Sequence, residues 1–110
     1  MLPYEVESIG VKVLNRIEPG EALRYEINIL AQGEYVGTHV FRVEVYGPDG
    51  AYHPEHSKNV LAENGFFSGE MPIAINDADG EWKIFIRDVA TGIVGEGRFI
   101  VTRDSVRENL

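Results

Sequence analysis

Two histidines stand at a spacing that could suit a metal ion. His53 and His56 flank a Pro-Glu pair, and histidines three residues apart can chelate one ion when a helix presents both on one face. Pro54 and the polar residues around it favour a loop instead, and zinc would need one or two further ligands from elsewhere in the chain. We therefore expect a solvated loop without a metal at this motif.

The segment 77–80 begins like a calcium-binding loop. Asp77-Ala78-Asp79-Gly80 gives a D-x-D-G start, but the full pattern D-x-[DN]-x-[DN]-G and the glutamate at its twelfth position are missing. Aspartate and glycine are also common in turns. We expect a turn here, and we predict no metal and no other cofactor for the chain.

No arrangement of residues suggests catalysis. The chain contains no cysteine and no serine in a G-x-S-x-G motif, which leaves no thiolate and no serine triad. Glycoside hydrolysis needs two carboxylates about 5–9.5 Å apart in a cleft, and no stretch of the sequence marks a cleft. His39 lies on the apolar side of a predicted strand, where we expect a buried and hydrogen-bonded histidine. We predict that the domain is not an enzyme.

Aromatic side chains are the remaining candidates for binding. Tyr35, Tyr46, Tyr52, Phe66 and Phe67 are predicted in loops or on the face away from the core. They could stack on sugar rings, pack against a neighbouring domain, or close the ends of the core. We take Tyr35, Tyr52, Phe66 and Phe67 as the candidate ligand-binding residues.

The stretch 81–88 must form the centre of the fold. Trp82, Ile84 and Ile86 alternate with polar or outward residues, which indicates a strand with one face in a core. Burial of this single tryptophan would remove about 150–250 Å² from water. That area corresponds to at most about 4–6 kcal/mol. Phe85, on the other side of the strand, should point away from Trp82.

Short apolar segments separated by turns fill the rest of the chain. Strands are predicted within 4–15, 22–31, 38–46, 59–62, 71–75 and 97–102, and twelve glycines and five prolines punctuate them. Gly10 predicts a bulge or kink that splits the first strand, and Asn64-Gly65 predicts a tight hairpin turn. Pro72 places its strand at an edge or at a bulge. No helix longer than one turn is expected. The sequence predicts about seven strands in one β-sandwich domain over 1–110, with its core at about 4–102 and a polar tail at 103–110.

Charge and length exclude several classes of function. The formal net charge is −8 with scattered acidic residues, which argues against binding to nucleic acid or to anionic membranes. No apolar run reaches the ~18 residues of a spanning helix, and residues 1–5 have no signal-peptide character. A chain of 110 residues suits one domain.

The stretch GEWKIFIRDVATG at 80–92 resembles the G-x-W-x-I-x-I-x-D-x-x-T-G signature of immunoglobulin-like bacterial modules. It is also similar to macroglobulin-type and fibronectin III-like domains. HVFRVEVYGPDG at 39–50 and IAIND at 73–77 look like the matching parts, so the resemblance covers about 11–102. It implies an all-β, immunoglobulin-like sandwich of about seven antiparallel strands. In the matching hairpin, Asp88 should accept backbone N–H bonds and Gly92 should take a positive φ.

The resemblance also implies a role. Such modules lie at the ends of large bacterial proteins, some of them resembling β-galactosidase-type glycoside hydrolases. We expect a non-catalytic accessory module whose partners are the neighbouring domains of its parent protein, with an extracytoplasmic parent favoured. The alternatives are a carbohydrate-binding module that uses the exposed aromatics and a homo-oligomerisation module that pairs through an edge strand.

Overall fold

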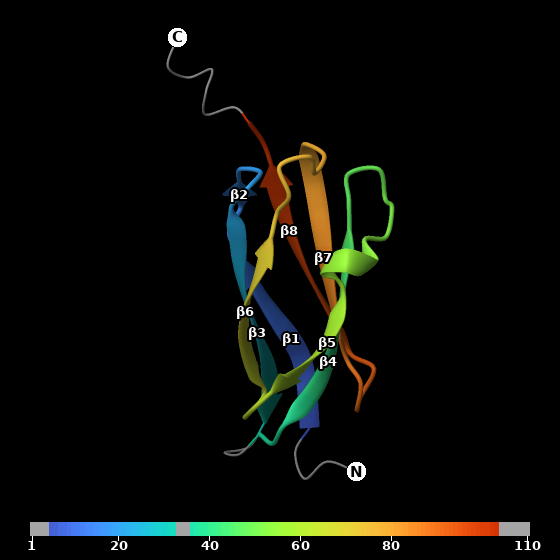
Figure 1. Cartoon of the computed structure of the whole chain (residues 1–110). Helices are drawn as coiled ribbons and strands as arrows, with labels where there is room; N and C mark the ends of the chain where they lie inside the picture. The colour runs from blue at the N-terminus through green and yellow to red at the C-terminus, as the bar shows by residue number, and fades with distance from the viewer. Residues whose placement is uncertain (1–4, 33–35, 104–110) are drawn as a thin grey trace.

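Two β-sheets face each other across one hydrophobic core in the computed structural model, which describes residues 5–32 and 36–103 (Figure 1). The three-stranded sheet has the order β1-β3-β6 and contains β1 (Glu5–Val13), β3 (Ala22–Gln32) and β6 (Phe66–Pro72). The five-stranded sheet has the order β2-β8-β7-β4-β5 and contains β2 (Arg16–Ile17), β4 (His39–Tyr46), β5 (Lys58–Ala62), β7 (Gly80–Asp88) and β8 (Val94–Val101). The only helical segment in the described ranges is the single turn η1 (Pro54–His56). The predicted all-β sandwich is confirmed.

Alternating burial along the strands builds the core, as the sequence predicts. In β3 the side chains of Leu23, Tyr25, Ile27 and Ile29 are buried while those between them are exposed. Trp82 of β7 is fully buried. It pairs with Phe99 of β8, and the two rings stack with centroids 6.1 Å apart. Phe99 is also buried, so these two rings form the centre of the core.

Two glycines of β8 let the sheets approach each other at one side of the sandwich. A Cβ atom on Gly95 would lie 2.8 Å from the Ile9 carbonyl oxygen of β1, and one on Gly97 would lie 2.9 Å from Val11 Cγ1. Both distances are too short for a real side chain. The predicted strand began only at Gly97, because glycines at alternate positions look like a turn when the facing strand is unknown.

The first strand is not split at Gly10, so that prediction is wrong. Gly10 pairs in register with Asn28, and the irregularity lies between Val6 and Ser8. A Cβ atom on Gly10 would meet Asn28 Oδ1 at 2.9 Å. This glycine therefore makes room for a cross-strand side chain on the outer face.

The Asn64-Gly65 turn connects the two sheets. Asn64 and Gly65 have φ angles of 56° and 72°, the left-handed pair that a tight two-residue turn requires. The turn delivers the chain from β5 in one sheet to β6 in the other. Phe66 and Phe67 thus begin a strand, whereas the sequence predicted a loop there and a strand at 71–75. Pro72 ends β6, which is an edge strand as predicted.

The strand β2 is the further element that the sequence did not predict. It has two residues, Arg16 and Ile17, and it pairs in parallel with β8. The described chain therefore has eight strands in place of about seven, and one of its strand pairs is not antiparallel. So short a strand shows no alternation that a sequence pattern could reveal.

Candidate functional site

An aromatic cluster lies on the outer face of the five-stranded sheet. It consists of Tyr46 on β4, Phe85 on β7, and Tyr52, which forms an isolated bridge with Tyr46. The Tyr46 and Phe85 ring centroids are 5.4 Å apart with the planes at 84°, and those of Tyr46 and Tyr52 are 5.5 Å apart with the planes at 52°. Tyr46 and Phe85 are half-buried. Phe85 points away from Trp82, as predicted.

Basic side chains and two shallow hollows adjoin the aromatic cluster. Arg42 donates a 2.9 Å hydrogen bond to the Tyr52 hydroxyl and lies opposite Arg87 across the β4–β7 pair. One hollow of about 400 Å³ and another of about 370 Å³ meet at Tyr46 and Phe85. Aromatic and arginine side chains are the types enriched in protein–protein interfaces. The cluster is therefore the best candidate interaction surface on the described part of the chain.

The structure does not bring the predicted binding residues together. Tyr52 belongs to the aromatic cluster, whereas Phe66 is 48% exposed at the start of β6, in the other sheet. Phe67 packs against the core with its ring centroid 6.0 Å from that of Tyr25. Tyr35 lies outside the described residues. Ligand binding by these four residues stays a prediction.

Tyr46 and Phe85, two of the three members of the aromatic cluster, are not among the four residues predicted from the sequence to bind a ligand. The alternation along 81–88 places the Phe85 side chain on the outer face. The contact between Phe85 and Tyr46 depends on the register of the β4–β7 pair. In that register Glu44 lies opposite Phe85 and Tyr46 lies opposite Lys83. No sequence pattern supplies that register.

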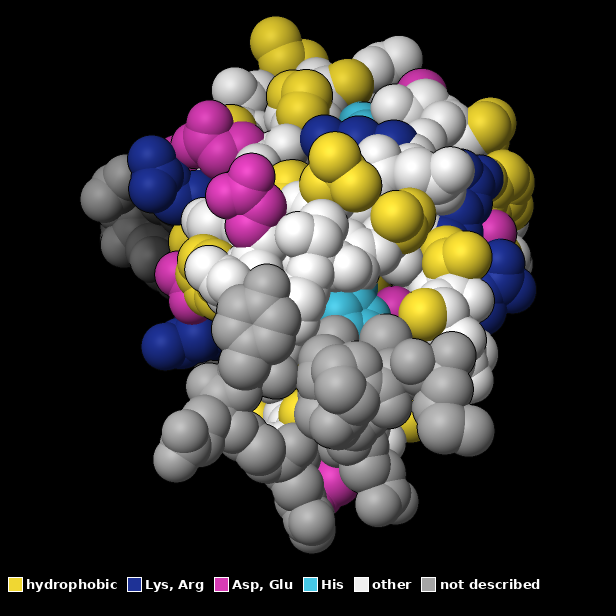
Figure 2. All heavy atoms as spheres, turned by 90° about the horizontal axis from the view of Figure 1, so that it is seen from below, with side chains coloured by type: hydrophobic (Ala, Val, Ile, Leu, Met, Phe, Trp, Pro, Cys, Tyr) yellow, Lys and Arg dark blue, Asp and Glu magenta, His cyan; other side chains and the backbone are white. Residues whose placement is uncertain are grey.

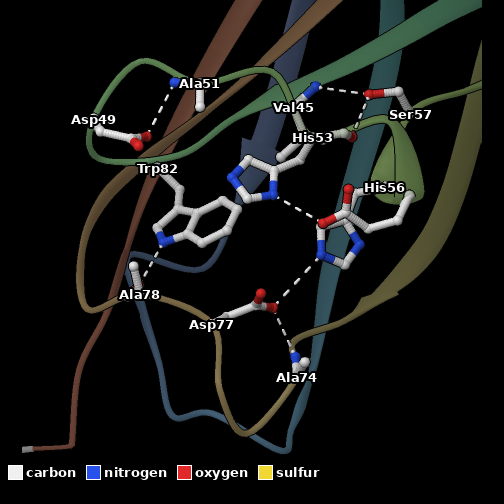
Figure 3. A network of polar contacts seen from close by, with 11 residues as sticks. Val45, Asp49, Ala51, His53, His56, Ser57, Ala74, Asp77, Ala78 and Trp82 are labelled. Atoms are coloured by element: carbon white, nitrogen blue, oxygen red, sulfur yellow. Dashed lines mark hydrogen bonds and ion pairs between the residues drawn. The ribbon is translucent and has the colours of Figure 1, made fainter.

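A second group of polar residues lies over the Trp82 ring (Figure 3). His53 directly precedes the turn η1, and its ring centroid lies 4.5 Å from that of Trp82. The ring centroid of His56, the last residue of η1, lies 6.2 Å from that of Trp82. The His56 side chain is only 8% exposed, and that of His53 is 25% exposed. The predicted solvated loop is therefore wrong for these two rings, because the indole offers them an apolar face to pack on.

Hydrogen bonds hold the loops around these rings (Figure 3). The Trp82 Nε1–H donates to the Ala78 carbonyl oxygen at 2.9 Å, and the Ala74 N–H donates to Asp77 Oδ2 at 2.7 Å. His53 Nδ1 and Glu55 Oε2 are 2.8 Å apart. This hydrogen bond from His53 lowers the pKa of the Glu55 carboxyl below its ordinary value. The segment that contains Asp77 forms the predicted turn, and Asp79 pairs with Arg103.

His39 and Asp88 form a buried pair at the other end of β4. His39 Nδ1 lies 2.8 Å from Asp88 Oδ1, and the side chains are 1% and 0% exposed. Thr91 Oγ1 donates to Asp88 Oδ2 at 2.7 Å, and the Gly92 N–H donates to the Asp88 carbonyl oxygen. The expected buried, satisfied histidine and the positive φ of Gly92, 78°, are confirmed. The Asp88 carboxylate binds side chains where we expected backbone N–H groups, and the pair is too buried to meet a substrate.

The end of the sandwich shown in Figure 2 carries acidic, basic and hydrophobic side chains in a mixed arrangement. In that view neither the acidic nor the basic side chains form a continuous patch over the described atoms. Val40 and Leu61, which face each other across the β4–β5 pair, are 36% and 66% exposed.

Within the described ranges no helix has the length and apolarity to cross a membrane.

No family model matches the chain, and no curated protein matches it. Solved structures do match. A mutant of Salmonella alpha-2-macroglobulin has a TM-score of 0.67 and 20% identity over 87% of this chain, which spans only 6% of that protein. The CARDB domain of a Pyrococcus furiosus protein, in complex with di-metal ions, has a TM-score of 0.62 and 13% identity over 89% of this chain and 93% of its own.

The β-glucosidase of Listeria innocua also matches, with a TM-score of 0.55 and 14% identity over 90% of this chain and 16% of its own. At these identities the likeness concerns the fold alone. The chain has the immunoglobulin-like β-sandwich fold that its sequence predicts.

Proposed function

We propose that this chain is a non-catalytic accessory domain that packs against a neighbouring domain of a larger bacterial protein. The observation that carries the proposal is the aromatic cluster of Tyr46, Tyr52 and Phe85 on an uncovered sheet face. Rings inclined at 52° and 84° form no coplanar platform on which the face of a sugar ring could stack. They suit a contoured protein surface, which aromatic anchors flanked by arginine bind well.

The comparisons support an accessory role. Similar folds occur inside much longer chains, of which this chain would span 6% in the macroglobulin and 16% in the β-glucosidase. A carbohydrate-processing parent protein is the form of the proposal that the sequence resemblance favours. The aromatic cluster lies on the five-stranded sheet, so the three-stranded sheet can make separate contacts with other domains.

Binding in trans tests the proposal. The isotope-labelled chain is titrated with the full-length protein from which this segment has been deleted. We expect shifts of the resonances around Tyr46 and Phe85, and we expect Phe85→Ser to weaken binding about 30-fold, because truncating an aromatic anchor costs about 2 kcal/mol or more. Phe66→Ser, on the opposite sheet, should leave binding unchanged. Equal weakening by both variants, or no binding at all, would contradict the proposal.

The isolated chain should hydrolyse no glycoside. Chromogenic glycosides of several sugars provide the assay. Turnover that disappears when one carboxylate is replaced by its amide would show that the domain is an enzyme and would overturn the non-catalytic role.

The carbohydrate-binding alternative rests on the exposed rings of Tyr52 and Phe66. It predicts that oligosaccharides shift the resonances of Tyr35, Tyr52 or Phe66, and a glycan array without binding would count against it. Pairing of two copies through the edge strand β5 is a further alternative, since Leu61 on that strand is 66% exposed. Light scattering that shows a monomer at high concentration would remove it.

A further inference from the structure

Three side chains from two separate segments converge beside the buried Trp82 ring. Glu55 and His56 come from η1, and Asp77 comes from the loop before β7. Each offers one ligand atom, and these atoms all lie within 4.8 Å of one another. We propose that Glu55, His56 and Asp77 bind one divalent transition-metal ion, with zinc as the reference ion. One imidazole nitrogen and two carboxylate oxygens form a donor set that zinc accepts, with water as the fourth ligand.

The burial of the His56 ring, and the missing hydrogen-bond partner of one of its nitrogens, is the observation that points to a ligand. Its side chain is 8% exposed, and its Nε2 atom is buried without a hydrogen-bond partner among the described residues. A buried polar atom that lacks a partner destabilises the folded chain. A metal ion on Nε2 would supply the missing partner.

The distance from His56 to Asp77 fits a shared ion better than a hydrogen bond. His56 Nε2 and Asp77 Oδ2 are 3.6 Å apart (Figure 3), which exceeds the ~2.7–3.2 Å of an N–H···O bond. Two ligands of one tetrahedral zinc, with bonds of about 2.0–2.2 Å, lie about 3.4 Å apart. These two atoms are thus almost at the separation that a common ion requires.

Neighbouring groups already orient the two carboxylates. The Ala74 N–H holds Asp77 Oδ2 at 2.7 Å, and the His53 ring holds Glu55 Oε2 at 2.8 Å. His53 is itself packed on the Trp82 ring. Hydrogen bonds of this kind to ligating carboxylates are typical supports of metal sites.

The ion would join η1 to the loop before β7 across the indole. Because the unfolded chain cannot hold these three ligands together, binding of the ion would add to the free energy of unfolding. The site shares no residue with the aromatic cluster, so this inference goes beyond the proposed function and does not depend on it.

Titration of the metal-free chain with zinc chloride tests the inference. We expect one equivalent of zinc to bind with saturation, seen by calorimetry, and the melting temperature to rise. The chain has three histidines, so long-range proton–nitrogen spectra can resolve their rings. The His56 ring nitrogens should shift on binding, and those of His39, buried against Asp88, should stay unchanged.

Matched variants locate the site. Asp77→Asn and Glu55→Gln should each weaken zinc binding at least about tenfold. Asp79→Asn changes a carboxylate that pairs with Arg103 instead, and it should leave the affinity unchanged. Because Asp77 also accepts the Ala74 N–H, its variant could unfold. The Glu55 side chain, 55% exposed, keeps the test independent of folding.

Three outcomes would overturn the inference. One is the absence of saturable zinc binding, which would leave only a His56–Asp77 ion pair. Another is zinc binding that Glu55→Gln leaves unchanged. The third is a zinc-induced shift of the His39 ring while the His56 ring does not respond.

Discussion

Replacing Trp82 by alanine should destabilise the domain more than any other single truncation. The indole is fully buried between the sheets, stacked on Phe99 and covered by the His53 ring. Its Nε1–H donates a 2.9 Å hydrogen bond to the Ala78 carbonyl oxygen. The substitution would therefore remove a packed ring from the centre of the core and a hydrogen bond from its rim.

The expected loss is about 4 kcal/mol. The area of the indole corresponds to at most about 4–6 kcal/mol, and measured Trp→Ala changes in cores cost about 3–5 kcal/mol. The lost hydrogen bond adds little, because Ala78 is exposed and water can bind its carbonyl group. Since a domain of this kind has about 5–15 kcal/mol in total, the variant should be close to unfolding.

Urea unfolding followed by circular dichroism measures the change, because the substitution removes the only tryptophan fluorophore. With a slope of about 2 kcal/mol per molar urea, the midpoint should fall by about 2 M. Trp82→Phe, which keeps an aromatic ring, should lose much less, and Phe66→Ala on the surface should lose little. A Trp82→Ala midpoint equal to that of the unchanged protein would refute the core described above.

Three further changes test other contacts by the same unfolding assay. His39→Leu leaves the buried Asp88 carboxylate without its histidine partner and should cost about 3–5 kcal/mol. Gly95→Ala forces a Cβ atom to 2.8 Å from the Ile9 carbonyl oxygen and should cost about 1–3 kcal/mol. Burial raises the pKa of the Tyr25 phenol, so the unfolded chain ionises first and stability should fall as the pH rises above about 10. Tyr25→Phe should reduce that fall.

Each of these changes has a control or a contradicting result. Thr91→Val removes the other partner of Asp88 and should cost less than His39→Leu. Gly10→Ala meets only the end of the flexible Asn28 side chain, so it should cost less than Gly95→Ala. Equal costs within either pair would argue against the contacts described. A decline at alkaline pH that Tyr25→Phe does not change would show that Tyr25 is not its source.

The strands with strict alternation could be predicted from the sequence because burial of one face leaves a period of two. Trp82, Ile84 and Ile86 on β7 and the buried residues of β3 are of this kind. The start of β8 escaped prediction because Gly95 and Gly97 carry no side chain to show the pattern. Their role depends on the approach of β1, a contact between sheets that no local pattern contains.

The candidate sites depend even more on long-range contacts. Phe85 could be placed on the outer face from its own strand, but its contact with Tyr46 needs the β4–β7 register. The sequence predicts that His56 lies in a solvated loop. Its burial, and its approach to Asp77, follow from packing on an indole that is distant along the chain. The sequence therefore predicted the scaffold well and the grouping of the site residues poorly.

Hydroxyl-radical footprinting of the larger protein that we propose contains this chain tests the central claim most directly. The oxidation rates of Tyr46, Tyr52 and Phe85 are compared between the intact protein and the isolated domain, with Phe66 on the opposite sheet as the internal reference. We predict that the three rings of the aromatic cluster are strongly protected in the intact protein. Equal oxidation of these rings in both forms would contradict a domain that packs through this face.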